Sequence, residues 1–129
     1  MNRDMRSELL AAASAAPCCG EDGSVSQHFC LDATFIGFAG HFPGYPVVPA
    51  VTQLLAAQLL LEQSEGAPLA LQRVSHAKFL QQLQPEQVFR VTCRPKPGKP
   101  LCYDVRIHLE EELASSFRLT VAPREKHHG

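Results

Sequence analysis

The chain has 129 residues and a formal net charge of −1, with 12 lysines and arginines against 13 aspartates and glutamates. This length allows one domain with one hydrophobic core. The hydrophobic fraction of 45% and the charged fraction of 19% are typical of a globular protein rather than a disordered one. Without an overall basic charge, no nucleic-acid partner is expected. No apolar run approaches the roughly 20 residues of a membrane span, so no membrane association is expected.

The cysteine pattern and the N-terminal residues indicate the cellular compartment in which the protein is expected. The chain has 5 cysteines, an odd number without a C-x-x-C pair, so neither a disulfide framework nor a zinc site is expected. Residues 1–16 lack the basic start and the long apolar stretch of a signal peptide. We therefore expect a cytoplasmic protein without a metal.

The N-terminal part predicts a short helix, a strand and an unusual loop. Residues 5–16 favour a helix that Pro17 ends, and residues 25–31 favour a strand. Residues 37–49 hold three glycines and three prolines among aromatic and aliphatic side chains. Such a segment forms neither a helix nor a central strand, and it is too apolar for a solvent-exposed loop. We expect a rigid, buried loop that serves a site.

The rest of the chain predicts one long helix followed by an antiparallel meander. Pro49 at the start and Gly66 at the end delimit a helix over residues 50–65, which is apolar nearly all round and should be buried. Strand-like runs follow at residues 71–80, 88–94, 101–109 and 114–121. A curved sheet of five or six strands wrapped around the helix would bury it, which predicts the α+β class.

These elements divide the chain into three parts. Residues 25–122 are expected to form the domain. Residues 1–24 would form an N-terminal helix and loop before it, and residues 123–129 a polar tail after it.

The loop segment also carries a family resemblance. Residues 38–49, F-A-G-H-F-P-G-Y-P-V-V-P, closely resemble the G-H-F-P-G-x-P-x-x-P segment of hotdog-fold 3-hydroxyacyl-[acyl-carrier-protein] dehydratases. The continuation A-V-T-Q-L at residues 50–54 is most similar to the branch associated with aryl-polyene-type pathways, where P-G-V-x-Q-L is usual. Lys78, Phe79 and Pro85 resemble the family's K-F-x-x-x-x-x-P strand, and the resemblance spans residues 25–122.

The resemblance implies a hotdog fold, with one long central helix wrapped by a curved antiparallel β-sheet, in a dimer whose sheets pair edge to edge. It implies a substrate carried on the phosphopantetheine arm of an acyl carrier protein, and no cofactor. His41 would be the base that removes the C2 proton, a task that suits an imidazole near neutral pH. The backbone N–H of Ala50, at a helix N-terminus, would stabilise the thioester oxygen. The substrate-binding candidates are Phe38, Gly40, Phe42, Pro43, Gly44, Tyr45, Val48, Pro49, Gln53, Leu55 and Gln58.

Two positions depart from the family pattern. Ala50 stands where the family has a glycine, a change that keeps the backbone N–H, and the second departure concerns the acid. The family's acid lies on the central helix fourteen residues after the histidine, and here that position is Leu55, which cannot donate a proton. Gln58 shares the face of Leu55, but an amide is not a general acid, and Glu62 lies about 10 Å further along the helix. Gln53 or Gln58 could hold a water. Four possibilities stay open: slow dehydration, dehydration together with an acid-bearing related subunit, thioester hydrolysis, or carrier binding without chemistry.

The expected partners are an acyl carrier protein and a second hotdog subunit, either identical in a homodimer or acid-bearing in a heterodimer. Because the net charge is near zero, docking of an acidic carrier needs a local basic rim. The candidates for this rim are Arg73, Lys78, Arg90, Arg94 and Lys96. The histidines on strand-like runs are expected to be structural, namely His28, His76 and His108.

Overall fold

The computed structural model describes residues 4–35 and 47–124 of the chain. Two helices and six strands lie in these ranges. In chain order they are α1 (Met5–Ala12), β1 (Cys18–Cys19), β2 (Val25–Cys30), α2 (Ala50–Glu65), β3 (Leu69–Phe79), β4 (Val88–Pro95), β5 (Cys102–Leu109) and β6 (Glu112–Pro123).

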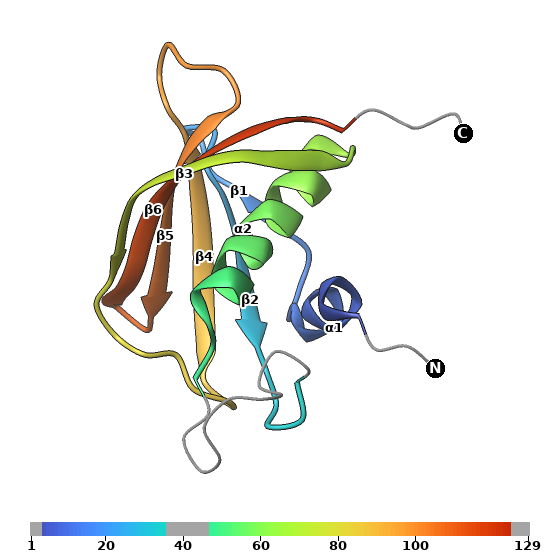
Figure 1. Cartoon of the computed structure of the whole chain (residues 1–129), viewed down its shortest axis with the longest axis vertical. Helices are drawn as coiled ribbons and strands as arrows, with labels where there is room; N and C mark the ends of the chain where they lie inside the picture. The colour runs from blue at the N-terminus through green and yellow to red at the C-terminus, as the bar shows by residue number, and fades with distance from the viewer. Residues whose placement is uncertain (1–3, 36–46, 125–129) are drawn as a thin grey trace.

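The six strands form one antiparallel sheet in the order β1-β2-β4-β5-β6-β3, and the sheet curves around α2 (Figure 1). Side chains alternate along the central strands, as a half-buried sheet requires. On β4, for example, Phe89, Val91 and Cys93 are buried, and the residues between them are more exposed. The predicted architecture, a long helix against an antiparallel sheet, is confirmed.

Helix α2 has the predicted bounds because its ends carry strong local signals. Pro49 occupies the N-cap position with extended backbone, and Gly66 adopts a left-handed conformation at φ 72°. The N–H of Gly66 donates to the carbonyl of Glu62 at 2.8 Å, which closes the last turn. A residue with a side chain would be strained at this backbone conformation.

The expectation that α2 is buried all round is wrong at its N-terminal end. The apolar series Ala56, Ala57, Leu59, Leu60 and Leu61 is fully buried against the sheet. By contrast, Val51 is 62% exposed, and Leu54 and Leu55 are only partly buried. The sheet covers one side of the helix (Figure 1), and Val51 at the start of the helix points away from the core.

Helix α1 is shorter than predicted because the chain turns extended after Ala12. Ala13 bridges to Phe29, and the N–H of Ser14 donates to the carbonyl of His28 at 2.9 Å. The side chain of Arg6 pairs with Glu62, which ties α1 to α2. In the described part of the chain, no helix is both long and apolar enough to cross a membrane.

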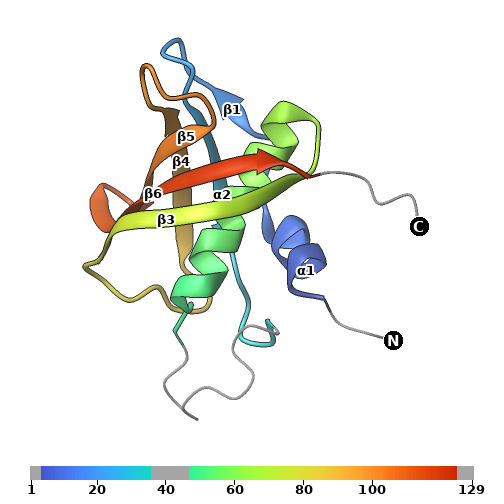
Figure 2. The ribbon, with the colours of Figure 1, turned by 45° about the horizontal axis from the view of Figure 1, so that its top comes forward.

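Strand β3 forms one edge of the sheet, next to β6 (Figure 2). It is long, at 11 residues, and most of its side chains are exposed. Val74 is 36% exposed and Phe79 is 47% exposed. Among residues 4–35 and 47–124, no further strand pairs with the outer edge of β3.

Candidate functional site

The structure describes the helix side of the predicted site and not its loop side. The candidates that lie outside the described residues are Phe38, Gly40, His41, Phe42, Pro43, Gly44 and Tyr45. The candidates that the structure places, all at or near the start of α2, are Val48, Pro49, Ala50, Gln53, Leu55 and Gln58.

The chain just before α2 is held by two backbone-directed hydrogen bonds. Val48 is 4% exposed, and its N–H donates to the carbonyl of Leu83 at 2.7 Å. Its own carbonyl accepts a hydrogen bond from Nε2 of Gln53 at 3.1 Å. The C-terminal end of the loop segment is therefore fixed to the body of the protein from both sides.

Gln53 links three elements through its amide. Besides donating to Val48, it accepts a 2.7 Å hydrogen bond at Oε1 from the hydroxyl of Ser115 on β6. Gln53 is 3% exposed and Ser115 is 0% exposed, so the whole link is buried. Both ends of the amide are thus engaged within the protein, which makes Gln53 a brace between loop, helix and sheet.

The start of α2 presents backbone donors without a compensating acid. The carbonyl of Pro49 accepts from the N–H groups of Thr52 and Gln53, each at 3.1 Å, so those of Ala50 and Val51 precede the first intrahelical bonds. Among the described residues, no side chain caps this end of the helix, and the first turn of α2 holds no acidic residue. This end of the helix consequently carries an unneutralised partial positive charge.

Leu55 has no acid to replace it on its own helix face. Residues 50–61 contain no aspartate or glutamate. The carboxylate of Glu62 accepts from the N–H of Leu69 at 2.8 Å and pairs with Arg6. The side chain of Gln58 donates to the carbonyl of Leu69 at 2.9 Å. Gln58 and Glu62 therefore both help to fix the start of β3.

In the described part of the site, neither a cluster of metal-binding side chains nor a reactive buried thiol is present. No group of three or more histidine, cysteine or acidic side chains is placed to hold a metal ion in the described ranges. Cys93 lies on the inner face of β4, where burial raises the pKa of its thiol to about 12. Such a thiol stays protonated near neutral pH and is not a nucleophile.

The residue that sequence reasoning missed is Ser115. Its position continues the inward-facing series of Phe117, Leu119 and Val121, all of which are buried. A serine in an inward apolar series needs a hydrogen-bond partner, and this need is a signal that the sequence does carry. The identity of that partner depends on the three-dimensional fold.

Comparison with solved structures identifies the fold. The chain resembles the dehydratase heterocomplex ApeI:P from Xenorhabdus doucetiae with a TM-score of 0.74 and 20% identity, covering 87% of this chain and 96% of that one. An uncharacterized protein from Erwinia carotovora subsp. atroseptica matches with a TM-score of 0.64 and 23% identity, covering 84% and 91%. The Escherichia coli PaaI protein from the phenylacetic acid degradation operon matches at 0.61 and 14%, covering 84% and 81%. The fold is the hotdog fold, as predicted.

The family follows from sequence. The family model described as ApeI-like, ApeI dehydratase, matches residues 18–118. The chain therefore belongs to the ApeI-like dehydratase family, which confirms the resemblance carried by the loop segment. No match was found among curated protein sequences.

Proposed function

We propose that this chain is a 3-hydroxyacyl-[acyl-carrier-protein] dehydratase-like protein that removes water from a 3-hydroxyacyl thioester in fatty-acid or polyene-type biosynthesis. The observation that carries the proposal is the G-H-F-P-G segment, residues 40–44, which comes five residues before a helix whose first turn holds no acid. In a family of dehydratases, this combination provides a base and a carbonyl-binding group.

In the proposed reaction, His41 removes the proton from C2 of the acyl chain. The thioester oxygen becomes negative as this bond breaks, and the N–H of Ala50 at the start of α2 stabilises it. The electrons then expel the C3 hydroxyl, which must gain a proton to leave as water. The substrate arrives on the phosphopantetheine arm of an acyl carrier protein, and the protein itself needs no cofactor.

The helix position that would supply this last proton is Leu55. Gln53 and Gln58 could only orient a water as a weak substitute, and hydrogen bonds within the protein engage both of their side chains. Proton donation by a positioned acid is worth roughly 10² to 10⁴ in rate. We therefore infer that the homodimer dehydrates slowly.

A related, acid-bearing subunit would complete the site. The exposed outer edge of β3 is the surface on which a second hotdog subunit would pair, because an unpaired strand edge favours strand addition. The similar structure from Xenorhabdus doucetiae is a dehydratase heterocomplex, which supports a heteromeric arrangement. In such a heterodimer, His41 would face the partner's acid across the interface.

For carrier docking, the proposed rim is best placed on β3. Arg73 and Lys78 are exposed there, at the edge proposed for dimerisation. Arg90 and Arg94 lie on the face of β4 opposite the buried Cys93, and thus away from α2. We expect carrier binding to take place in the cytoplasm. In solution, the affinity for the carrier should fall with rising salt concentration, and Arg73→Gln should reduce it more than Arg94→Gln does.

The experiment that tests the function is incubation of the pure protein with a series of 3-hydroxyacyl carrier proteins, read by mass spectrometry. Loss of water supports dehydration, and loss of the whole acyl group would instead show a thioesterase. Stable binding with neither change would show a non-catalytic partner, the alternative that Leu55 favours.

A substitution sharpens this test. Leu55→Glu should accelerate dehydration, and adding His41→Ala should abolish the gain. Leu55 is only partly buried, so the new carboxyl costs less stability than one in the core, although partial burial still favours its protonated form. A folded, dimeric Leu55→Glu variant without any gain would mean that the missing acid does not limit the reaction.

Complementation tests the heterodimer separately. A related acid-bearing subunit, with its own histidine removed, should be inactive alone and active when mixed with this chain. A heterodimer that forms and stays inactive would exclude a shared site.

A further inference from the structure

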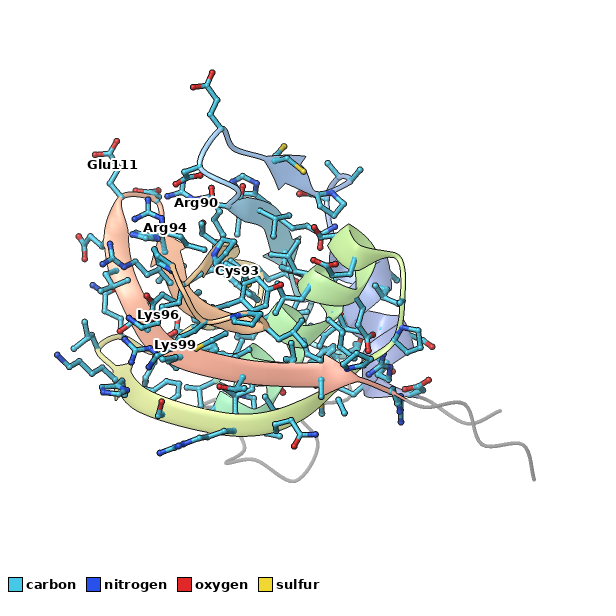
Figure 3. All side chains as sticks on the ribbon, turned by 90° about the horizontal axis from the view of Figure 1, so that it is seen from above. Arg90, Cys93, Arg94, Lys96, Lys99 and Glu111 are labelled. Carbon is cyan, nitrogen blue, oxygen red and sulfur yellow. The ribbon has the colours of Figure 1, made fainter. Side chains whose placement is uncertain are left out.

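A cationic depression lies on the outer face of the sheet, across the central strands β4 and β5. Its volume is about 230 Å³, and the residues that line it are Arg90, Thr92, Arg94, Asp104, Arg106 and His108. On β4 these side chains alternate with buried ones, so they point away from α2. Figure 3 shows Arg90 and Arg94 on the side of the strand opposite the helices, with Cys93 turned the other way. The depression is therefore separate from the proposed dehydratase site.

The strand register places three arginines and His108 on one face of β4 and β5, with one acid, Asp104, opposite Arg94. Arg90 stands opposite His108, and Arg106 stands opposite Thr92 on the neighbouring strand. Arg90 is also flanked by His28 on its other side. Arg94 thus has an opposite charge across the strands, whereas no acid stands opposite Arg90 or Arg106. A bound anion would supply that missing negative charge.

Two carboxylates lie in or beside the depression, and each pairs with an arginine other than Arg90 and Arg106. Asp104 accepts a 3.0 Å hydrogen bond from Nε of Arg118, and Asp22 pairs with Arg94 at 3.1 Å. Within residues 4–35 and 47–124, no carboxylate forms an ion pair with Arg90 or Arg106. The guanidinium groups of Arg90 and Arg106 are thus left with unused donors.

His108 gives an independent indication. Its Nδ1 atom is buried and has no hydrogen-bond partner in the described part of the chain. The pKa of the ring is lowered by burial first, and then by the positive charges of Arg90 and Arg106. Arg90 stands opposite His108 in the strand register, and both line the same depression as Arg106, so the three side chains form one cluster.

We propose that this cluster, defined by Arg90, Arg106 and His108 with the Thr92 hydroxyl, binds a phosphate group of the monoester class. A phosphate offers three acceptor oxygens and nearly two negative charges, which match two planar guanidinium groups better than a single carboxylate does. The depression is open to solvent on one side and large enough for a phosphate with part of the molecule that bears it. This binding does not depend on the proposed dehydratase activity.

The test uses the full-length chain labelled with ¹⁵N and titrated with inorganic phosphate at constant ionic strength. Saturable shifts of the amide signals of β4 and β5 are expected, and sodium chloride should not reproduce them. Arg106→Gln, an exposed position, should weaken phosphate binding about tenfold to a hundredfold, as expected for loss of a hydrogen bond between charged groups. Arg90→Gln should act in the same way.

The matched control is Lys99→Gln, which also removes one positive charge but lies in the turn between β4 and β5, outside the depression. It should leave phosphate binding unchanged. Two results would overturn the proposal: Lys99→Gln weakens phosphate binding as much as Arg106→Gln does, or the amide shifts grow without saturation. Either result would show non-specific electrostatic attraction, which would draw any acidic macromolecule to the protein. Methyl phosphate should bind more tightly than dimethyl phosphate, and the reverse order would overturn the assignment to monoesters.

Discussion

The buried link through Gln53 makes a quantitative prediction about stability. Gln53→Leu keeps a side chain of similar size and removes both hydrogen bonds of the amide. It leaves the carbonyl of Val48 and the hydroxyl of Ser115 without partners, at sites 4% and 0% exposed respectively. Each buried polar group that loses its partner costs about 1 to 3 kcal/mol. The free energy of unfolding should therefore fall by roughly 2 to 6 kcal/mol, a large share of the 5 to 15 kcal/mol typical of a domain.

Urea denaturation at fixed protein concentration measures this loss, because the midpoint shifts while the slope stays constant. The matched control is Gln58→Leu on the same helix. That change removes one hydrogen bond and leaves one carbonyl, that of Leu69, a residue 3% exposed, without its donor. Its expected cost is about 1 to 3 kcal/mol, half of that for Gln53→Leu, which leaves two groups without partners.

A double-mutant cycle isolates the pair. Ser115→Ala combined with Gln53→Leu should cost less than the sum of the two single changes, because each already breaks the same 2.7 Å hydrogen bond. Strict additivity, or a loss in Gln53→Leu no larger than in Gln58→Leu, would refute the argument that this amide braces the loop.

Two further predictions concern titratable groups. Cys18 and Cys19 are exposed and should react promptly with a thiol reagent at pH 8. Cys93 is buried and the pKa of its thiol is raised to about 12, so it should react only in denaturant. Equal reaction rates for all thiols in the folded protein would contradict this burial. The pKa of His108 is lowered in the folded protein by burial and then by Arg90 and Arg106, so the unfolded chain takes up the proton first as the pH falls. The free energy of unfolding should therefore decrease as the pH falls below about 6.5, the ordinary pKa of histidine. In urea titrations at pH 7.5 and pH 5.5, His108→Asn should make the free energy of unfolding depend less on pH. An unchanged pH dependence would show that the ring does not contribute.

The elements with strong local signals could be predicted from the sequence. Helix α2 has the predicted bounds, Ala50–Glu65, because Pro49 and Gly66 fix its ends through backbone conformation alone. The main strands lie within two residues of their predicted bounds, since their alternation reflects a sheet buried on one face. Family membership followed from a segment of only twelve residues.

Features that depend on long-range pairing could not be predicted. Helix α1 ends early because Ala13 and Ser14 pair with β2, a contact without a local signal. The partner of Gln53 lies on β6, 62 residues further along the chain. The cluster around His108 also arises from register, which brings Arg90 beside a histidine of the next strand. These residues can be read from the sequence, but the contacts between them depend on the three-dimensional fold.

At the helix side of the proposed site, stabilisation of the thioester oxygen and proton donation to the hydroxyl would depend on different groups. Stabilisation of the thioester oxygen would come from backbone N–H groups at the start of α2, which persist whatever side chain Ala50 carries, unless that side chain is proline. Proton donation would come from one side chain, and here that side chain is Leu55. A single substitution can therefore remove the second function and leave the first intact. In a homodimer the defect occurs in both half-sites, whereas an acid-bearing partner would repair the half-site that contains His41 of this chain. Loss of the acid is thus more readily tolerated in a subunit that works beside a related one, which is why the heterodimer is the arrangement to test first.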